Sequence, residues 1–333
     1  MRLFTRVAAV VTILTASLFA QNYTSLNGIA KDATGAVVPN VAIEITNKAT
    51  SAKRTDKTDG QGRYNLGQVT PGTYKLEAKA NGFKSEIIDS LILEVNLPST
   101  VNLTLQVGNV SDSVLVSAEA IQLNTTDASI GNTIGERPIT ELPFNARNPV
   151  GLLALQPGVT FIANEKDDPR SGAVNGGKSD QGNITLDGVD VNDQQSRTAF
   201  TSVLRVALDS IQEFRVTTAN SGADGGRSSG AQVSLVTKSG TNQLHGSAYE
   251  YNRNTITEAN DFFSNSAGVG RTVLNRNIWG FTGSSPIKKD KLFIFGNWEE
   301  RRDASALTAT RIVPNADFRN GIFTYIWSLP AAS

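Results

Sequence analysis

The stretch that decides the fold is GGRSSGAQVSLVTKSGTNQLHGSAYEYNRN, Gly225–Asn254. It begins with a glycine-rich turn, but a phosphate-binding loop must lead into a helix whose N-terminal amides face the anion. Here the turn leads into AQVSLVTK (Ala231–Lys238), whose alternation predicts a strand, and neither GxGxxG nor GK[ST] is present. The glycines therefore indicate a tight reversal between strands, with Arg227 paired inside the protein.

Alternation continues after Lys238. NQLHGSAYEYNRN predicts a strand with His245, Ser247, Tyr249 and Tyr251 on one side and Gly246, Ala248 and Glu250 on the other. Asn277–Asp303 predicts two strands joined by a charged turn at Lys288–Lys291; Leu292, Ile294, Gly296 and Trp298 share one face, and Phe293, Phe295 and Asn297 the other. Strands of about nine to eleven residues with short polar turns are typical of an outer-membrane β-barrel, although a soluble antiparallel sheet has the same period.

The composition argues against several classes of function. The chain has 333 residues, and its 31 Lys and Arg balance its 31 Asp and Glu, so no net charge favours nucleic acid. There is no cysteine, and His245 is the single histidine. We therefore predict no enzyme, no cofactor and no metal, because a nucleophile, base and orienting group cannot be assembled around one histidine.

The first twenty residues are typical of a secretory signal peptide. Arg2 and Arg6 precede an apolar run that is too short to span a bilayer, and small residues follow it. Cleavage is expected near Ala20. The mature chain is therefore predicted to act outside the cytoplasm.

Residues 25–107 predict a β-sandwich. Short alternating segments, VAIEITN, TYKLEAKA and TVNLTLQV among them, are separated by turn signals such as Asp59-Gly60 and Pro71-Gly72. Tyr64, Tyr74 and Phe83 are more typical of core packing in a small sandwich than of an aromatic platform for sugar.

The same region resembles the carboxypeptidase regulatory-like, transthyretin-like sandwich. The residues that carry this resemblance are GxxxDxxGxxxP from Gly28, and TDGQGRYNLGQVTPGTYKLEAKANGFK from Thr58 to Lys84. The resemblance implies a carbohydrate-binding-like fold, and such modules occur on enzymes and on receptors alike.

A polar linker, GNVSDSVLVSAEAIQLNTTD, follows the sandwich and contains one β-prone run. Such a run is either a strand that adds to a partner or an edge strand that packs on a neighbour. Its residues are Asp112, Ser113, Val114, Leu115, Val116 and Ser117.

Residues 130–238 predict a compact α+β domain of about 110 residues. Pro149 begins a short helix that Pro157-Gly158 ends, and Val203–Thr218 predicts a short helix followed by a strand.

In GNITLDGVDVND two short strands flank a turn at Asp187-Gly188. The oxygen-bearing residues there do not follow the EF-hand order, so turn formation and capping explain them better than a cation; the weaker alternative is a ligand-binding apex. These residues are Asp187, Asp190, Asn192 and Asp193.

Four runs together resemble an Oar-like TonB-dependent outer-membrane receptor: LPFNARNPVGLLALQPGV, NGGKSDQGNITLDGVDVND, LDSIQEFRVTTANSGADGGRSSGAQVSLVTKSGTNQLHGSAYEYNRN and WGFTGSSPIKKDKLFIFGNWEERRD. Arg227, Gly230 and Lys238 match the G-R-x-x-G-A and T-K-S-G-T-N motifs of the family's plug. The resemblance implies a plug inside a barrel in outer-membrane lipid, an external ligand (carbohydrate, peptide or siderophore), and TonB with the inner-membrane energising complex as partners.

The resemblance also implies roles for particular residues. TonB pulls by strand addition, and Asp112–Ser117 is the candidate TonB box. Arg147, Arg227 and Lys238 are expected to bind the barrel wall from the plug. We expect replacement of Arg227 with alanine to reduce uptake; unchanged uptake would remove that role.

The fold class predicted is therefore mainly β: a seven-stranded transthyretin/Ig-like sandwich, an α+β plug, and the first strands of an outer-membrane barrel. The expected domains are a signal peptide (1–20), the sandwich (21–107), a linker (108–126), the plug (127–240) and the start of the barrel (241–333). About 22 strands need on the order of 400 residues, so the barrel is expected to be incomplete. The alternative is a secreted or periplasmic non-enzymatic carbohydrate-binding module left as a receptor remnant.

Overall fold

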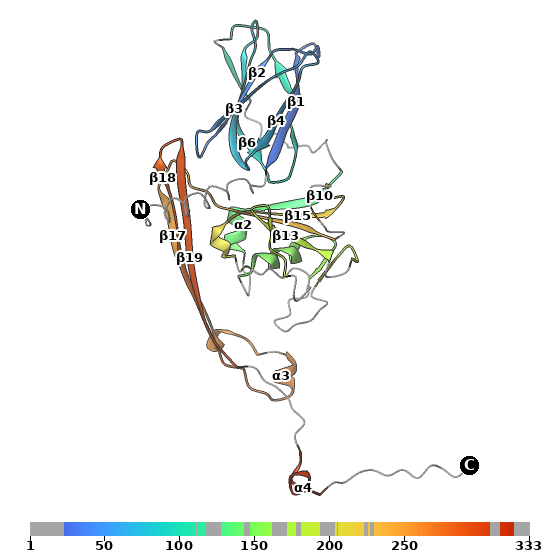
Figure 1. Ribbon diagram of the computed structural model, residues 1–333, viewed down its shortest axis with the longest axis vertical. Helices are drawn as coiled ribbons and strands as arrows, with labels where there is room; N and C mark the ends of the chain where they lie inside the picture. Colours follow the sequence, from blue (N-terminus) through green and yellow to red (C-terminus); the bar gives the residue numbers. More distant parts are fainter. Residues whose placement is uncertain are drawn as a thin grey trace, which may run out of the picture. The chain divides into compact units, whose positions relative to one another are not determined.

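Strands dominate the computed structural model, as the sequence predicts (Figure 1). It describes residues 23–110, 112–116, 128–142, 147–161, 172–177, 181–193, 204, 206–222, 226, 230–260, 262–306 and 314–322. The predicted signal peptide, residues 1–20, lies outside these residues. Within the described part of the chain, no helix is both long enough and apolar enough to cross a membrane.

Two sheets form the N-terminal sandwich. One has four strands in the order β4-β1-β7, with β8 also pairing β1; the other has five, in the order β3-β2-β5-β6-β9. The strands are β1 (Thr24–Asp32), β2 (Ala42–Asn47), β3 (Lys53–Lys57), β4 (Arg63–Val69), β5 (Gly72–Lys79), β6 (Ser85–Leu93), β7 (Ser99–Thr100), β8 (Leu103–Leu105) and β9 (Ser113–Val116). With β7 and β8 taken as one interrupted strand, β1 to β8 form the predicted seven.

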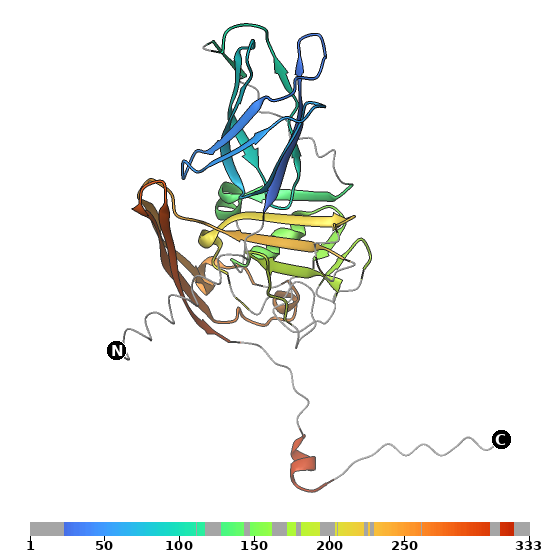
Figure 2. The same cartoon turned by 45° about the horizontal axis from the view of Figure 1, so that its top comes forward.

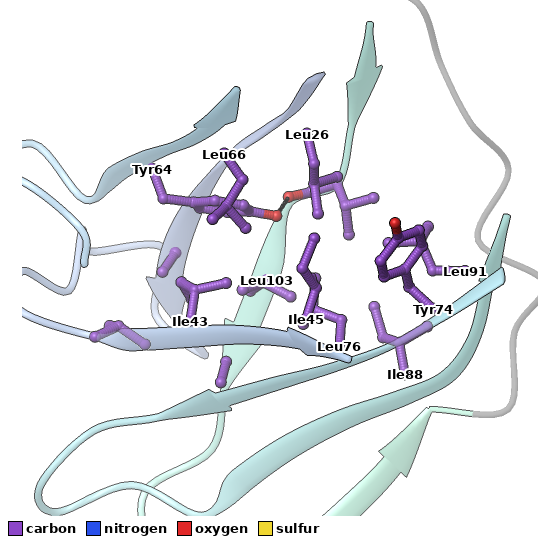
Figure 3. Close-up of a cluster of buried hydrophobic side chains, with 14 of the residues drawn as sticks. Leu26, Ile43, Ile45, Tyr64, Leu66, Tyr74, Leu76, Ile88, Leu91 and Leu103 are labelled. Atoms are coloured by element: carbon purple, nitrogen blue, oxygen red, sulfur yellow. Dashed lines mark hydrogen bonds between the residues drawn. The ribbon is translucent and has the colours of Figure 1, made fainter. Parts of the chain in front are cut away.

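Alternating apolar residues of both sheets fill the space between them (Figure 3). Tyr64 and Tyr74 are each only 3% exposed, and Phe83 packs against the same cluster. The Tyr64 hydroxyl donates to the carbonyl of Val101 at 2.7 Å, which satisfies the polar end of a buried ring. The aromatic residues therefore serve the core, as predicted, and do not form a platform at the surface.

The middle domain follows, and its sheet has five strands in the order β10-β15-β16-β13-β14. Figure 2 shows this sheet from a second direction. Its largest fully buried side chain is Phe214, on β15, which lies between β10 and β16. The elements are β10 (Ile130–Gly135), α2 (Glu136–Glu141), η2 (Pro149–Leu155), β11 (Val159–Phe161), β12 (Gly172–Val174), β13 (Asn183–Leu186), β14 (Val189–Asp190), η4 (Leu208–Ser210), β15 (Ile211–Ala219) and β16 (Gln232–Thr237).

The predicted start and end of the helix at Pro149 agree with the structure, but the helix type differs. Pro149 begins η2, the Asn148 side chain accepts from the Val150 N–H, and the helix ends before Pro157-Gly158. It is a 3-10 helix of seven residues. The predicted helix before Ile211 is limited to the three residues of η4 in the described chain.

The C-terminal strands form a three-stranded sheet in the order β17-β18-β19. At 15 and 14 residues, β18 and β19 are longer than predicted. Along β19 the exposed residues alternate with half-buried ones, which confirms the two predicted faces. The elements are β17 (His245–Asn254), η6 (Thr255–Thr257), α3 (Phe262–Ser266), β18 (Leu274–Lys288), β19 (Leu292–Ser305) and α4 (Ala316–Arg319).

Candidate functional site

The β-prone run of the linker is an edge strand of the sandwich. β9 pairs in parallel with the first half of β6, in a register that sets Ser113 beside Ser85 and Leu115 beside Ile87. It stands last in its sheet, so no described strand pairs with its other side. Of the two predicted alternatives, packing on a neighbour is therefore observed, and the outer edge remains open for a partner. Ser117 lies outside the described residues.

Hydrogen bonds fasten the chain to β6 just before β9 begins. The Ser85 N–H donates to the carbonyl of Asp112 at 2.8 Å, and the Ser85 hydroxyl donates to the carbonyl of Val110 at 2.8 Å. The Gly108 N–H donates to the carbonyl of Gly82 at 3.0 Å. Ser85 is 3% exposed, so its two bonds are shielded from water and hold β9 in one register.

The outer side of β9 is accessible. Leu115 is 62% exposed, Asp112 and Ser113 are exposed, and Val114 is half-buried. An apolar, uncharged edge strand is the kind of edge to which another strand adds.

A buried carboxyl group lies on β6 opposite Val114. Glu86 is 8% exposed, and its carboxylate accepts the backbone N–H of Thr104. Burial raises the pKa of Glu86 from 4.5 to about 7. Sequence reasoning missed this residue, although a signal existed, because Glu86 and the core residue Ile88 have the same parity in the strand and so share a face.

The raised pKa of Glu86 predicts that this group's contribution to the stability of the sandwich is largest in acid. Between pH 4.5 and about 7 the unfolded chain releases the proton while the folded chain retains it, so stability falls as pH rises and then levels off. We expect Glu86→Gln to remove this fall and to stabilise the sandwich at pH 8 by about 2 kcal/mol. Native-state hydrogen exchange of β5 amides at several pH values, corrected for intrinsic rates, would measure it.

The control for this experiment is Glu44, whose pKa is lowered by its hydrogen bond with Lys53. Glu44→Gln should leave the loss of stability between pH 5 and 8 in place. An unchanged pH profile in Glu86→Gln would contradict the assignment.

A second buried carboxyl group belongs to the middle domain. Glu213 on β15 is 7% exposed and accepts the N–H of Val95 at 2.8 Å. Burial raises its pKa to about 7 as well. Unlike Glu86, it has the opposite parity to its strand's core residues Phe214 and Val216, so alternation does not reveal its burial.

The structure brings two of the three predicted plug cations to the same short helix. Arg147 forms a buried ion pair with Asp209 of η4, and the Lys238 N–H donates to the carbonyl of Ser210 at 2.8 Å. The Lys238 ammonium group also pairs with Glu136 at 2.7 Å. These partners lie within the middle domain, and the predicted contacts with a barrel wall stay a prediction. Arg227 lies outside the described residues.

The acidic and amide residues after β13 build a turn. Asp187 has a φ of 49°, and its carboxylate accepts from both the N–H and the hydroxyl of Thr237, at 2.9 and 2.8 Å. Asp190 accepts from the N–H of Asn192, whose own side chain accepts from Ile184. Asp193 is half-buried. Across the residues that the structure describes, no three His, Cys, Asp or Glu gather closely enough to hold a metal ion.

Family models match both ends of the chain. Residues 25–106 match the carboxypeptidase regulatory-like domain, and residues 236–332 match the outer membrane beta barrel domain. A curated relative, the TonB-dependent transporter Oar of Myxococcus xanthus, is 24% identical over 297 residues, which are 84% of this chain. The chain spans 27% of the length of that relative.

Two solved receptors are similar at low scores. The siderophore receptor PirA of Acinetobacter baumannii has a TM-score of 0.38 and 21% identity, covering 51% of this chain and 24% of that chain. The ferric enterobactin receptor PfeA of Pseudomonas aeruginosa has a TM-score of 0.38 and 16% identity, covering 53% of this chain and 25% of that chain. Homology of the present chain therefore rests on the sequence matches.

Proposed function

We propose that this chain, a homologue of the TonB-dependent transporter Oar, is the N-terminal portion of an outer-membrane receptor that takes up a ligand with energy supplied through TonB. The middle domain is the plug, and β17 to β19 are the first strands of the barrel around it. The observation that carries the proposal is β9, an open, uncharged edge strand of the sandwich sheet that precedes the middle domain in the sequence.

The proposed barrel strands have a side suited to lipid. On β19, Leu292, Ile294 and Trp298 share one exposed face, and Trp298 stacks on Phe281 of β18 with ring centroids 5.8 Å apart. The connection between β18 and β19 is the short turn at Lys288–Lys291, whereas a longer connection with two short helices joins β17 to β18. Because periplasmic turns are short and external loops long, the lysine turn faces the periplasm in this proposal.

TonB binds β9 by strand addition in the proposed mechanism. The partner's strand pairs with backbone groups of β9, and the pull then passes along the linker into the plug. The plug moves within the barrel and admits the ligand, which is a carbohydrate, a peptide or a siderophore. The alternative function, a secreted sugar-binding module, lacks support from the sandwich aromatics, because Tyr64 and Tyr74 are buried in the core.

The proposal predicts that one backbone N–H of β9 is needed for TonB binding. Leu115→Pro removes this donor, and we expect the affinity of the full chain for the periplasmic domain of TonB to fall at least about tenfold. Leu115→Val keeps the donor and introduces a β-branched residue that favours a strand, so its affinity should stay near that of the natural chain. Titration of the detergent-solubilised full chain by calorimetry measures both. Equal binding by Leu115→Pro would refute Asp112–Ser117 as the TonB box.

A further inference from the structure

We infer that the sandwich is itself part of the TonB docking surface: the partner's strand adds to the outer edge of β9 while β9 remains paired with β6 as the last strand of the sandwich sheet. This inference rests on the proposed function, since it takes β9 as the strand that TonB binds. In this arrangement TonB binds an edge of a folded domain and not a segment of a free, flexible tether.

The direction of the backbone groups of β9 supports this arrangement. The Ser85 N–H donates to the carbonyl of Asp112, and Ser85 is beside Ser113 in the register. In a parallel ladder alternate residues direct their backbone groups to the same neighbour. Asp112 and Val114 therefore direct theirs to β6, and Ser113 and Leu115 direct theirs away from it. The outward pair is free to receive a strand without loss of any bond to β6.

The bonds that hold β9 oppose its release. Detachment would remove the partner of the Ser85 N–H, the carbonyl of Asp112, at a residue that is 3% exposed. Polar groups left buried without partners are unfavourable, so addition at the free edge is the lower-energy route. A strand that is already ordered also loses less conformational entropy on binding than a flexible segment does.

The two edges of the same sheet differ in charge. β3, at the opposite edge, reads Lys53-Arg54-Thr55-Asp56-Lys57, and charged side chains on an edge strand prevent unwanted pairing. β9 reads Ser113-Val114-Leu115-Val116 and carries no charge. Charge thus protects the β3 edge against pairing with another strand, whereas the β9 edge has no such protection. A partner strand is therefore expected to add at β9.

The register also indicates what the partner strand presents. Leu115 is 62% exposed, and its neighbour Ile87 is half-buried. Neighbours in register direct their side chains to the same face of a sheet, and this face is opposite to that of the core residue Ile88. The partner strand is therefore expected to place an apolar side chain beside Leu115.

A disulfide between β6 and β9 tests whether β9 stays in place. The chain has no cysteine, so Ile87→Cys with Leu115→Cys introduces a single pair. Neighbouring parallel strands lie about 4.8 Å apart, within the Cα separation of roughly 4.4 to 6.8 Å that a disulfide spans. We expect the full-length oxidised variant in detergent to bind the periplasmic domain of TonB within about threefold of its reduced form.

The other outcomes of this experiment distinguish failure of the inference from failure of the proposed function. If the oxidised form binds at least about tenfold more weakly than the reduced form, β9 must leave β6, and the inference is wrong while the TonB box stands. Failure of the disulfide to form would overturn the pairing of β6 with β9. If the natural chain and both forms all fail to bind, the proposed function fails together with the inference.

Residue-resolved hydrogen exchange gives a second, independent readout on the natural chain. Addition of the TonB domain should increase protection of the Ser113 and Leu115 amides at least about tenfold and leave the existing protection of Val114 in place. Loss of protection at Val114 on binding would overturn the inference.

Discussion

Gly28→Ala is expected to destabilise the sandwich by more than about 3 kcal/mol. Gly28 lies in the middle of β1, where a Cβ atom would come within 1.8 Å of the carbonyl oxygen of Val101 and 2.7 Å of the Tyr64 ring. The first of these is a backbone atom in the connection between β7 and β8, so it cannot turn aside as a flexible side chain does. The second belongs to a ring that is 3% exposed and whose hydroxyl is already bonded to the same carbonyl.

Gly67→Ala is the matched control for this prediction. Gly67 lies in β4, which pairs with β1 in the same sheet, and a Cβ atom there would meet nothing within 4 Å. Because alanine restricts the unfolded chain more than glycine does, this variant should be unchanged or more stable by about 0.5 to 1 kcal/mol. Native-state hydrogen exchange of β2 and β5 amides in the full chain gives both free energies of unfolding. Similar values for the two variants would contradict the close approach at Gly28.

The strands of this protein follow from local sequence. Period-two alternation predicted β2, β5, β16 and the faces of β19, and the Asp187-Gly188 turn appears where the two residues best suited to positive φ stand together. These features depend on neighbours in the chain, which is why the sequence displays them. The interruption between β7 and β8 was not predicted; within it, Val101 accepts a hydrogen bond from Tyr64, a residue distant in the sequence.

Only part of the candidate site could be predicted from the sequence. The β-prone character of Ser113–Val116 is a local property, but its pairing with β6 depends on a loop that returns the chain to Ser85. Parallel pairing of this kind leaves no short turn signal in the sequence. The same holds for Arg147: it was expected to bind a barrel wall, whereas the partner observed in the structure is Asp209, 62 residues away in the sequence.

Arg147→Met is expected to destabilise the middle domain by about 3 to 5 kcal/mol. The side chains of Arg147 and Asp209 are only 10% and 11% exposed, and the guanidinium group bonds the carboxylate. Methionine fills a similar volume but leaves the Asp209 carboxylate buried without this cation, and an uncompensated buried charge is far more unfavourable than a lost surface pair. Hydrogen exchange of β16 amides in the full chain measures the change.

Two further variants separate the effect of removing the charge on stability from the effect of changing the packing. Arg147→Met combined with Asp209→Leu removes both charges, so most of the lost stability should return, because well-packed apolar residues replace buried ion pairs at little net change in free energy. Arg137→Met removes the cation of an exposed pair with Glu141, whose side chains are 85% and 62% exposed, and should change stability by less than about 0.5 kcal/mol. If the double variant were as unstable as Arg147→Met alone, shape at residue 147, rather than its charge, would hold η4 in place.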